Sequence, residues 1–346
     1  MYLLSIIILI LIFIIFIHQY KKLKKDDTYL TRKNIRDISD NDIDNDINND
    51  IDKLLQDDTY LTRKHIRDIA DYDINNDIDK LLQDVDHGKL KPNSIIVSIP
   101  NTIHILKNIL DKLNTNVILL FTDHNTRSIC VSNNNKHLLA DHNNVKHIFS
   151  ENWYDKPHPK VTQIPIGISY KDTYIKNLHE KLNEIEHTMI DNKDKPLRVL
   201  CNSHKKTYYK PKSGYRDDRR IMINMLWDSS IVDFCNDKHD FSGKSIVNTW
   251  EKHKDYAFEL SPSGNGLDCH RTYEAIILNT IPIVRSNTLD PIYKEHDLPI
   301  VIVDEWSEVT PENLQIWHNK HKHNFGNRTK NKMKINYWKE LINSMK

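Results

Sequence analysis

The chain has 346 residues, enough for two domains of ordinary size. Its 38% hydrophobic and 28% charged residues fit a folded enzyme with polar appendages. Four Cys residues without CxxC spacing support neither a zinc site nor a disulfide framework. The net charge is +1, but residues 26–86 contain 18 Asp against 8 Lys or Arg. The rest of the chain is therefore basic, which suits either an anionic ligand or a solvated Lys-rich surface.

Residues 2–17 form an apolar segment that is broken only by Ser5. At about 1.5 Å per residue the segment reaches about 24 Å, so with its flanks it can span a hydrocarbon core of roughly 30 Å. Four lysines follow, and no small-residue cleavage site is present. We therefore expect residues 1–25 to be an uncleaved single-pass membrane anchor with a basic flank. The lysines favour a cytoplasmic position for the rest of the chain, although a lumenal arrangement stays open.

A tandem repeat follows the anchor. The sequence DDTYLTRKNIRDISDNDIDNDINNDIDKLLQ at residues 26–56 returns at residues 57–83 with four residues fewer. Ile and Leu recur every four residues in both copies, which predicts helices. We expect residues 26–87 to form an acidic helical stem. The Asp-x-Asp strings lack the Gly and Glu of a calcium-binding loop, so we interpret them as solvated and expect no metal site.

Strands alternate with helices from residue 88 onward, a pattern that predicts parallel sheets. A linker at residues 193–196 divides the pattern into two blocks. We therefore expect two Rossmann-like α/β domains, at residues 88–195 and 196–346, with a cleft between them. The predicted strands cover residues 94–99, 116–122, 146–150, 162–168, 197–202, 231–235, 256–260, 281–284 and 299–303, and the predicted helices include residues 104–113, 173–189, 217–228 and parts of 312–346.

Residues 256–285 combine a strand, a polar turn, a helix and a second strand. The turn at residues 261–266 contains two of the seven glycines in the chain, and it can bring backbone amides close to a ligand. Asp268, His270, Arg271 and Glu274 follow at the start of the helix. Ligands of open α/β sheets bind at this edge, outside the carboxyl ends of the strands.

These residues resemble the C-terminal motif of exostosin-like glycosyltransferases. The resemblance rests on Ser261-Pro262-x-Gly264, Arg271-x-x-Glu274-Ala275 and Ile281-Pro282-Ile283-Val284. The run at residues 260–275 is most similar to the exostosin-like proteins of giant DNA viruses. Asn279-Thr280 departs from the Gly-Cys that is common in the family.

The resemblance implies a GT-B fold and a membrane-anchored glycosyltransferase. It implies a nucleotide-sugar donor, which we expect to be a UDP-sugar, bound mainly by the C-terminal domain. It further implies a glycan or glycoprotein acceptor and no essential metal or other cofactor. The alternative is a non-catalytic binding or scaffold protein on a degenerate glycosyltransferase fold.

A departing diphosphate needs cationic side chains and N–H donors for its negative charge. Arg271 is the first expected phosphate contact, with an ion pair to Glu274 or Asp268 as the alternative. The resemblance implies that Glu274 binds ribose hydroxyls, and a carboxylate that merely stabilises the helix N-terminus is the alternative. The expected donor-binding residues are Ser261, Gly264, Asn265, Gly266, His270, Arg271, Glu274, Arg216 and Arg219.

An inverting transfer needs a base that removes the proton of the acceptor hydroxyl. Asp123 and His124 follow the predicted strand 116–122, and Glu151 follows 146–150, so these three residues are the candidates. None of them has a distinctive spacing. The Lys- and Tyr-rich loop at residues 203–215 lacks an RNA-binding motif, so we expect no nucleic-acid partner.

Overall fold

The structure is a computed structural model of the chain, and it describes residues 60–98, 103–122, 139–153, 157–169, 178–203, 218–235, 243–264 and 266–346. The described residues belong to one compact unit, residues 59–346. The predicted anchor and the first repeat copy lie outside them. Within these ranges no helix is both long enough and apolar enough to cross a membrane.

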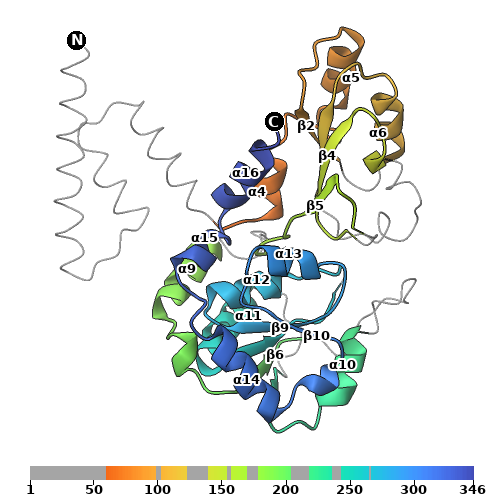
Figure 1. The fold of residues 1–346 in the computed structure, drawn as a ribbon. Coiled ribbons are helices and arrows are strands. Elements are labelled where there is room, and N and C mark those ends of the chain that lie inside the picture. The colour runs from red at the N-terminus through yellow and green to blue at the C-terminus, as the bar shows by residue number, and fades with distance from the viewer. Residues whose placement is uncertain are drawn as a thin grey trace, which may run out of the picture. The chain divides into compact units, whose positions relative to one another are not determined.

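The first sheet has five parallel strands in the order β1-β2-β3-β4-β5. Every residue of β2 and β3 is buried, as expected for central strands of a parallel sheet. Helices α5 (Ile78–Asp86) and α6 (Ile103–Leu110) lie beside the sheet (Figure 1). Its strands are β1 (Tyr72–Asp73), β2 (Ser94–Ser98), β3 (Val117–Phe121), β4 (Val145–Ser150) and β5 (Val161–Gln163).

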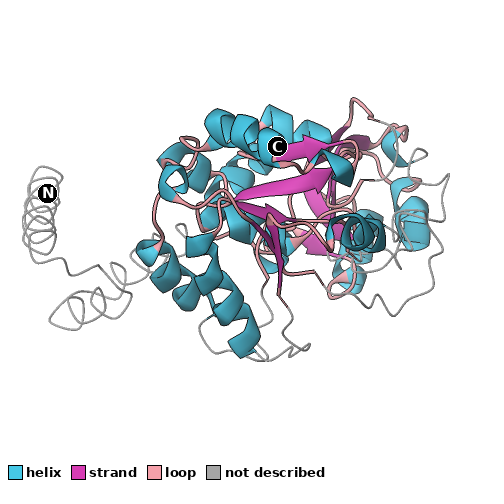
Figure 2. Cartoon of the chain, turned by 90° about the horizontal axis from the view of Figure 1, so that it is seen from below, coloured by secondary structure: helices cyan, strands magenta, loops and turns pink. Residues whose placement is uncertain are grey.

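The second sheet also has five parallel strands, in the order β10-β9-β8-β6-β7. This is the 2-1-3-4-5 order of doubly wound folds, so the winding direction reverses between β6 and β8. Helices flank the strands (Figure 2). The elements are β6 (Val199–Cys201), α10 (Asp218–Leu226), β7 (Val232–Phe234), α11 (Gly243–Lys252), η4 (His253–Asp255), β8 (Phe258–Leu260), α12 (His270–Ile277), β9 (Ile281–Arg285), α13 (Asp290–Glu295), β10 (Val301–Val303), η5 (Trp306–Glu308) and α14 (Pro311–His321).

The prediction of a stem that ends at residue 87 is wrong for the second repeat copy. Residues 60–87 form α4 (Arg63–Arg67), β1 and α5, and they complete the first sheet. Only two residue pairs join β1 to β2, Tyr72 to Ile96 and Asp73 to Val97. A strand this short shows no alternation of apolar and polar residues, which is why the sequence pattern did not reveal it.

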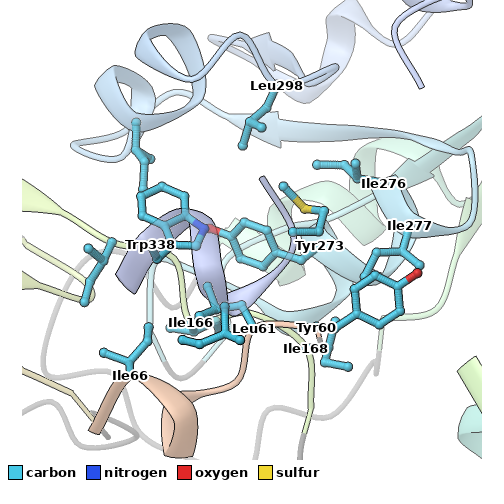
Figure 3. Close-up of a cluster of buried hydrophobic side chains, with 14 of the residues drawn as sticks. Tyr60, Leu61, Ile66, Ile166, Ile168, Tyr273, Ile276, Ile277, Leu298 and Trp338 are labelled. Carbon is cyan, nitrogen blue, oxygen red and sulfur yellow. The ribbon is translucent and has the colours of Figure 1, made fainter. Parts of the chain in front are cut away.

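The end of the chain packs against the beginning of the described region. We had expected this end to belong wholly to the second domain, at residues 196–346. Helix α16 (Ile335–Asn343) contacts α4. The Leu61 amide donates to the Met333 carbonyl at 2.8 Å. Trp338 of α16 lies in one buried cluster with Leu61 and with Tyr273 of α12 (Figure 3). Strands of both sheets contribute to this same cluster.

Two further helices connect these parts of the fold. Helix α9 (Leu178–Thr188) lies before the second sheet and contacts α11, and α15 (Asn327–Asn331) precedes α16. Tyr60 donates a hydrogen bond to Glu186 of α9, and Lys330 of α15 lies 2.6 Å from the same carboxylate. Glu186 thus joins the second repeat copy to the C-terminal segment.

Candidate functional site

A pocket of about 270 Å³ lies at the carboxyl end of the second sheet. Asn202 follows β6, Gly264 and Gly266 follow β8, and all three line the pocket. The segment after β5 and helix α4 also line the pocket, through Ser169 and Arg63. The pocket therefore occupies the reversal point between β6 and β8, the place where doubly wound sheets bind their ligands.

Arg63, Arg219 and Arg271 line the pocket, and the guanidinium groups of Arg219 and Arg271 are not fully satisfied. Arg271 donates from Nη2 to the Asn202 carbonyl at 3.4 Å. Arg271 Nη1 and Arg219 Nε are buried, and neither has a hydrogen-bond partner among the described residues. Burial lowers the pKa of Arg219, and the positive charge of Arg271 lowers this pKa further. Because buried N–H donors of cationic groups are costly when they lack a partner, the arrangement favours an anionic ligand.

The carboxylate nearest Arg271 is neither of the two expected from the sequence. The described ion pair joins Arg271 Nε to Glu259 Oε1 at 3.7 Å. Glu259 lies in β8 and is 1% exposed. Its position inside a buried strand gave no sequence signal that it faces an arginine.

The turn after β8 approaches other groups closely. A Cβ atom at Gly264 would lie 3.0 Å from Arg219 Nη2, and one at Gly266 would lie 2.7 Å from Asn152 Oδ1. Neither glycine has a positive φ. The two glycines are thus explained by the lack of space for a side chain.

Glu274 lines the pocket with its carboxylate already engaged. Its Oε2 accepts from Trp250 Nε1 at 3.0 Å, and its Oε1 accepts from the Ser169 amide at 3.1 Å. Burial raises the pKa of Glu274, and these two donors act in the opposite direction. Each carboxylate oxygen can accept a further hydrogen bond, so a hydroxyl of a ligand can still be recognised.

His270 and Asp268 connect the start of α12 to the segment after β5. His270 Nδ1 lies 2.7 Å from the Gly167 carbonyl, so this nitrogen carries a proton. Asp268 Oδ2 accepts from the Ile166 amide at 3.0 Å and from the Tyr273 hydroxyl at 2.7 Å. Asp268 is not the N-cap of α12, because Cys269 holds that position. Burial raises the pKa of Asp268 to about 6.

Glu151 is placed differently from the base that we expected. It is 1% exposed and does not line the pocket. Its Oε2 lies 3.0 Å from Nε of Arg63, which does line the pocket. A carboxylate in this position pairs with Arg63 behind the pocket wall, and its role as a base stays a prediction. Arg63 was not expected at the pocket, because it lies in the repeat that we interpreted as a stem.

Ser261 lies in the turn after β8 and is not among the residues that line the described pocket. The Ser261 hydroxyl lies 2.8 Å from Thr272 Oγ1, so Ser261 anchors the turn to α12. The other four predicted site residues, Asp123, His124, Arg216 and Asn265, lie outside the described residues. In the part of the chain that is described, no group of three or more His, Cys, Asp or Glu side chains could hold a metal ion.

Comparison with known proteins gives this chain no family. No family model matches it, and no curated protein matches its sequence. The fold and the pocket define its class as an α/β protein with two parallel five-stranded sheets and a cationic pocket at the reversal point of the second.

Proposed function

We propose that the chain is a membrane-anchored glycosyltransferase of the GT-B type that transfers a sugar from a nucleotide-sugar donor to a glycan or protein acceptor. The observation that carries this proposal is the placement of Arg219, Arg271 and Glu274 around one pocket. The sequence pattern selected the same three residues. The resemblance to exostosin-like glycosyltransferases adds the donor class, which we propose is a UDP-sugar.

The chemistry assigned to this pocket is stabilisation of a leaving diphosphate. Negative charge grows on the diphosphate as the sugar departs, and preorganised cations stabilise that charge. Arg219 and Arg271 supply two positive charges, and the N-terminus of α12 adds its helix dipole. Glu274 is assigned the hydroxyls of the nucleoside. Residues 2–17 would hold the protein at a membrane.

A second candidate function is binding of a nucleotide sugar without transfer. It is favoured by the position of Glu151, the one base candidate among the described residues, which pairs with Arg63 and does not line the pocket. Asp123 and His124 stay the candidate bases of the catalytic proposal. Loss of transfer but not of donor binding in Asp123→Asn or His124→Gln would identify the base.

Neighbouring arginines on α10 provide a matched test of donor binding. Arg219 lines the pocket, whereas Arg220 is exposed and does not. We expect UDP to raise the melting temperature of the full-length protein, because a ligand at 100 times its Kd stabilises by about 2.7 kcal/mol. Arg219→Ala should abolish this shift, and Arg220→Ala should keep it. Equal shifts in both variants would contradict the assignment of the pocket.

Catalysis is tested separately from binding. The full-length protein is incubated with UDP-sugars and glycan acceptors, and released UDP and the glycosylated product are measured. Production of both at the same rate supports transfer. Tight UDP binding without product for any donor and acceptor would favour the second candidate function.

A further inference from the structure

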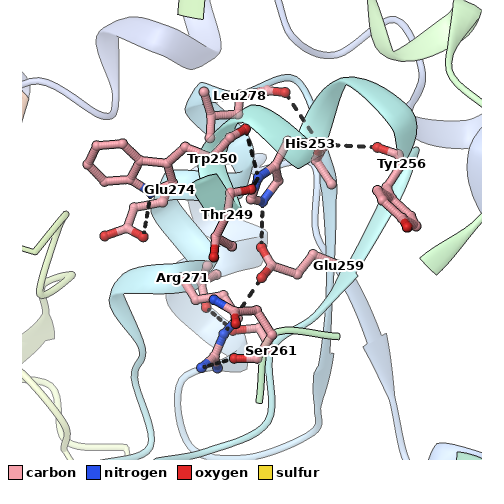
Figure 4. Close-up of polar contacts among 12 residues, drawn as sticks. Thr249, Trp250, His253, Tyr256, Glu259, Ser261, Arg271, Glu274 and Leu278 are labelled. Carbon is pink, nitrogen blue, oxygen red and sulfur yellow. Dashed lines mark hydrogen bonds and ion pairs between the residues drawn. The ribbon is translucent and has the colours of Figure 1, made fainter. Parts of the chain in front are cut away.

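His253, Glu259 and Arg271 form a chain of polar contacts next to the pocket (Figure 4). His253 Nδ1 lies 2.9 Å from the Thr249 carbonyl and 3.2 Å from the Trp250 carbonyl. Its Nε2 lies 2.9 Å from Glu259 Oε2. The side chains of His253 and Glu259 are each 1% exposed. Of the three, only Arg271 lines the pocket.

The hydrogen-bonding capacity of these groups determines how many protons they hold. A carbonyl oxygen only accepts, so His253 Nδ1 carries a proton. Nε2 then either donates a second proton to Glu259 or accepts one from a protonated Glu259. The two arrangements hold the same number of protons. In both, the net charge of the His253–Glu259 pair is zero.

This proton count changes the electrostatics of the pocket. A bare Glu259 carboxylate beside Arg271 would cancel one positive charge and would compete with an anionic ligand for the guanidinium. A His253–Glu259 pair with zero net charge does both to a smaller extent. Its polar oxygen still faces Arg271 Nε at 3.7 Å and favours one orientation of the guanidinium. The charges of Arg219 and Arg271 then both stay available to a ligand.

We propose that His253 and Glu259 are positioning residues for Arg271, which orient its guanidinium while leaving its charge available to the donor diphosphate. The proposal rests on the proposed function, because it takes the pocket as the donor site. Burial supports it, since a buried side chain with a fixed partner has little freedom to reorient. Neither residue contacts the substrate in this proposal.

Calorimetric titration of inorganic pyrophosphate into the full-length protein tests the proposal. The test is whether Glu259→Gln weakens or tightens pyrophosphate binding. Glu259→Gln preserves the size of the side chain and again forms a neutral pair with His253, but its contact with Arg271 is weaker. We expect pyrophosphate binding to weaken about tenfold, which corresponds to about 1.4 kcal/mol. If Glu259 were a bare carboxylate that competes with the anion, the same change would tighten binding. Tighter or unchanged binding overturns the proposal.

A double-mutant cycle separates positioning from a general structural effect. Lys lacks the planar fork that Glu259 orients, so Glu259→Gln should have little further effect on pyrophosphate binding in an Arg271→Lys background. Equal losses of pyrophosphate affinity in the wild-type and Arg271→Lys backgrounds would overturn the positioning role. The matched control is Glu251→Gln on the exposed side of α11, which should leave binding unchanged.

A second variant covers the case in which Glu259→Gln does not fold, which circular dichroism detects. His253→Gln removes the ring that shares the proton, so Glu259 becomes a carboxylate that pairs with Arg271, and pyrophosphate binding should again weaken. Unchanged binding in this variant overturns the proposal. If the wild-type protein binds neither pyrophosphate nor UDP, the proposed function itself fails. If the wild type binds and the variants bind equally well, only the positioning role fails.

Discussion

At the scale of single residues, the pocket combines side chains that the local pattern indicated with others that only folding brings near. Arg219, Arg271 and Glu274 were selected from the sequence, and all three line the pocket. Arg63 and Ser169 also line it, but they come from segments about 100 residues or more before α12. A sequence pattern covers neighbours along the chain, so it carried no signal for these two contributions.

Asp268 gives a prediction about pH. Its pKa rises from 3.8 in the unfolded chain to about 6 in the folded protein, mainly because it is buried. The folded state therefore holds more protons between these values, and stability falls as pH rises from about 4 to 6. The contribution of Asp268 to the free energy of unfolding is fully present below pH 3.8. It amounts to about 3 kcal/mol, at 1.36 kcal/mol per pKa unit.

Urea unfolding of the wild type and of Asp268→Asn at pH 4 and pH 7 measures this contribution. His321 acts in the opposite direction, since burial lowers its pKa from 6.5 to about 4. The comparison with Asp268→Asn cancels that effect, because His321 is present in both proteins. We expect the stability of the wild type to fall relative to the variant as pH rises. Parallel pH profiles would show that Asp268 titrates normally.

At the scale of elements, the positions of the strands after residue 88 could be predicted more closely than the contacts of the segments that follow them. The strand expected at residues 116–122 is observed at Val117–Phe121, because five consecutive apolar residues suit a buried parallel strand. The strand expected at 162–168 ends at Gln163. Residues 164–168 are also largely apolar, but after the Ile164 amide bonds to Ser150 of β4 the backbone leaves the sheet. Ile166 and Gly167 bond to Asp268 and His270 of the α12 region. Hydrophobicity indicated that they are buried but not what they pair with.

The second repeat copy gives a prediction at this scale. Leu61, Ile66, Ile74 and Leu81 are each at most 1% exposed. Burial of such a side chain contributes about 1.5–3 kcal/mol, so their loss is comparable to a total stability of about 5–15 kcal/mol. A chain that starts at residue 88 should therefore fail to fold, whereas one that starts at residue 59 should fold. Circular dichroism and urea unfolding of both chains test this, and cooperative unfolding of the shorter chain would contradict it.

At the scale of the whole molecule, the two sheets share a hydrophobic cluster. Strands β2, β3 and β9, together with α12 and α16, contribute buried residues to it. Polar contacts add to this connection, for example the Asp268 amide, which donates to Asn152 Oδ1 at 2.8 Å. The pocket walls are thus fixed by the same contacts that join the sheets.

This shared cluster predicts that residues 59–346 unfold in one transition. A calorimetric scan should give one peak, with a calorimetric enthalpy equal to the van't Hoff enthalpy. Intrinsic tryptophan fluorescence and the far-UV circular dichroism signal should change together. Two separated transitions would mean that each sheet has its own independent core.

The sequence by itself determined the alternation of strands and helices, the two parallel blocks and the cationic motif at the start of α12. These features depend on local periodicity and on chemistry within a few neighbouring residues. The tertiary structure decided that the second repeat copy belongs to the fold, that Glu259 rather than Glu274 or Asp268 faces Arg271, and that α16 packs against α4. Contacts between residues far apart in the chain produced these results, because packing joins surfaces whatever their separation along the sequence.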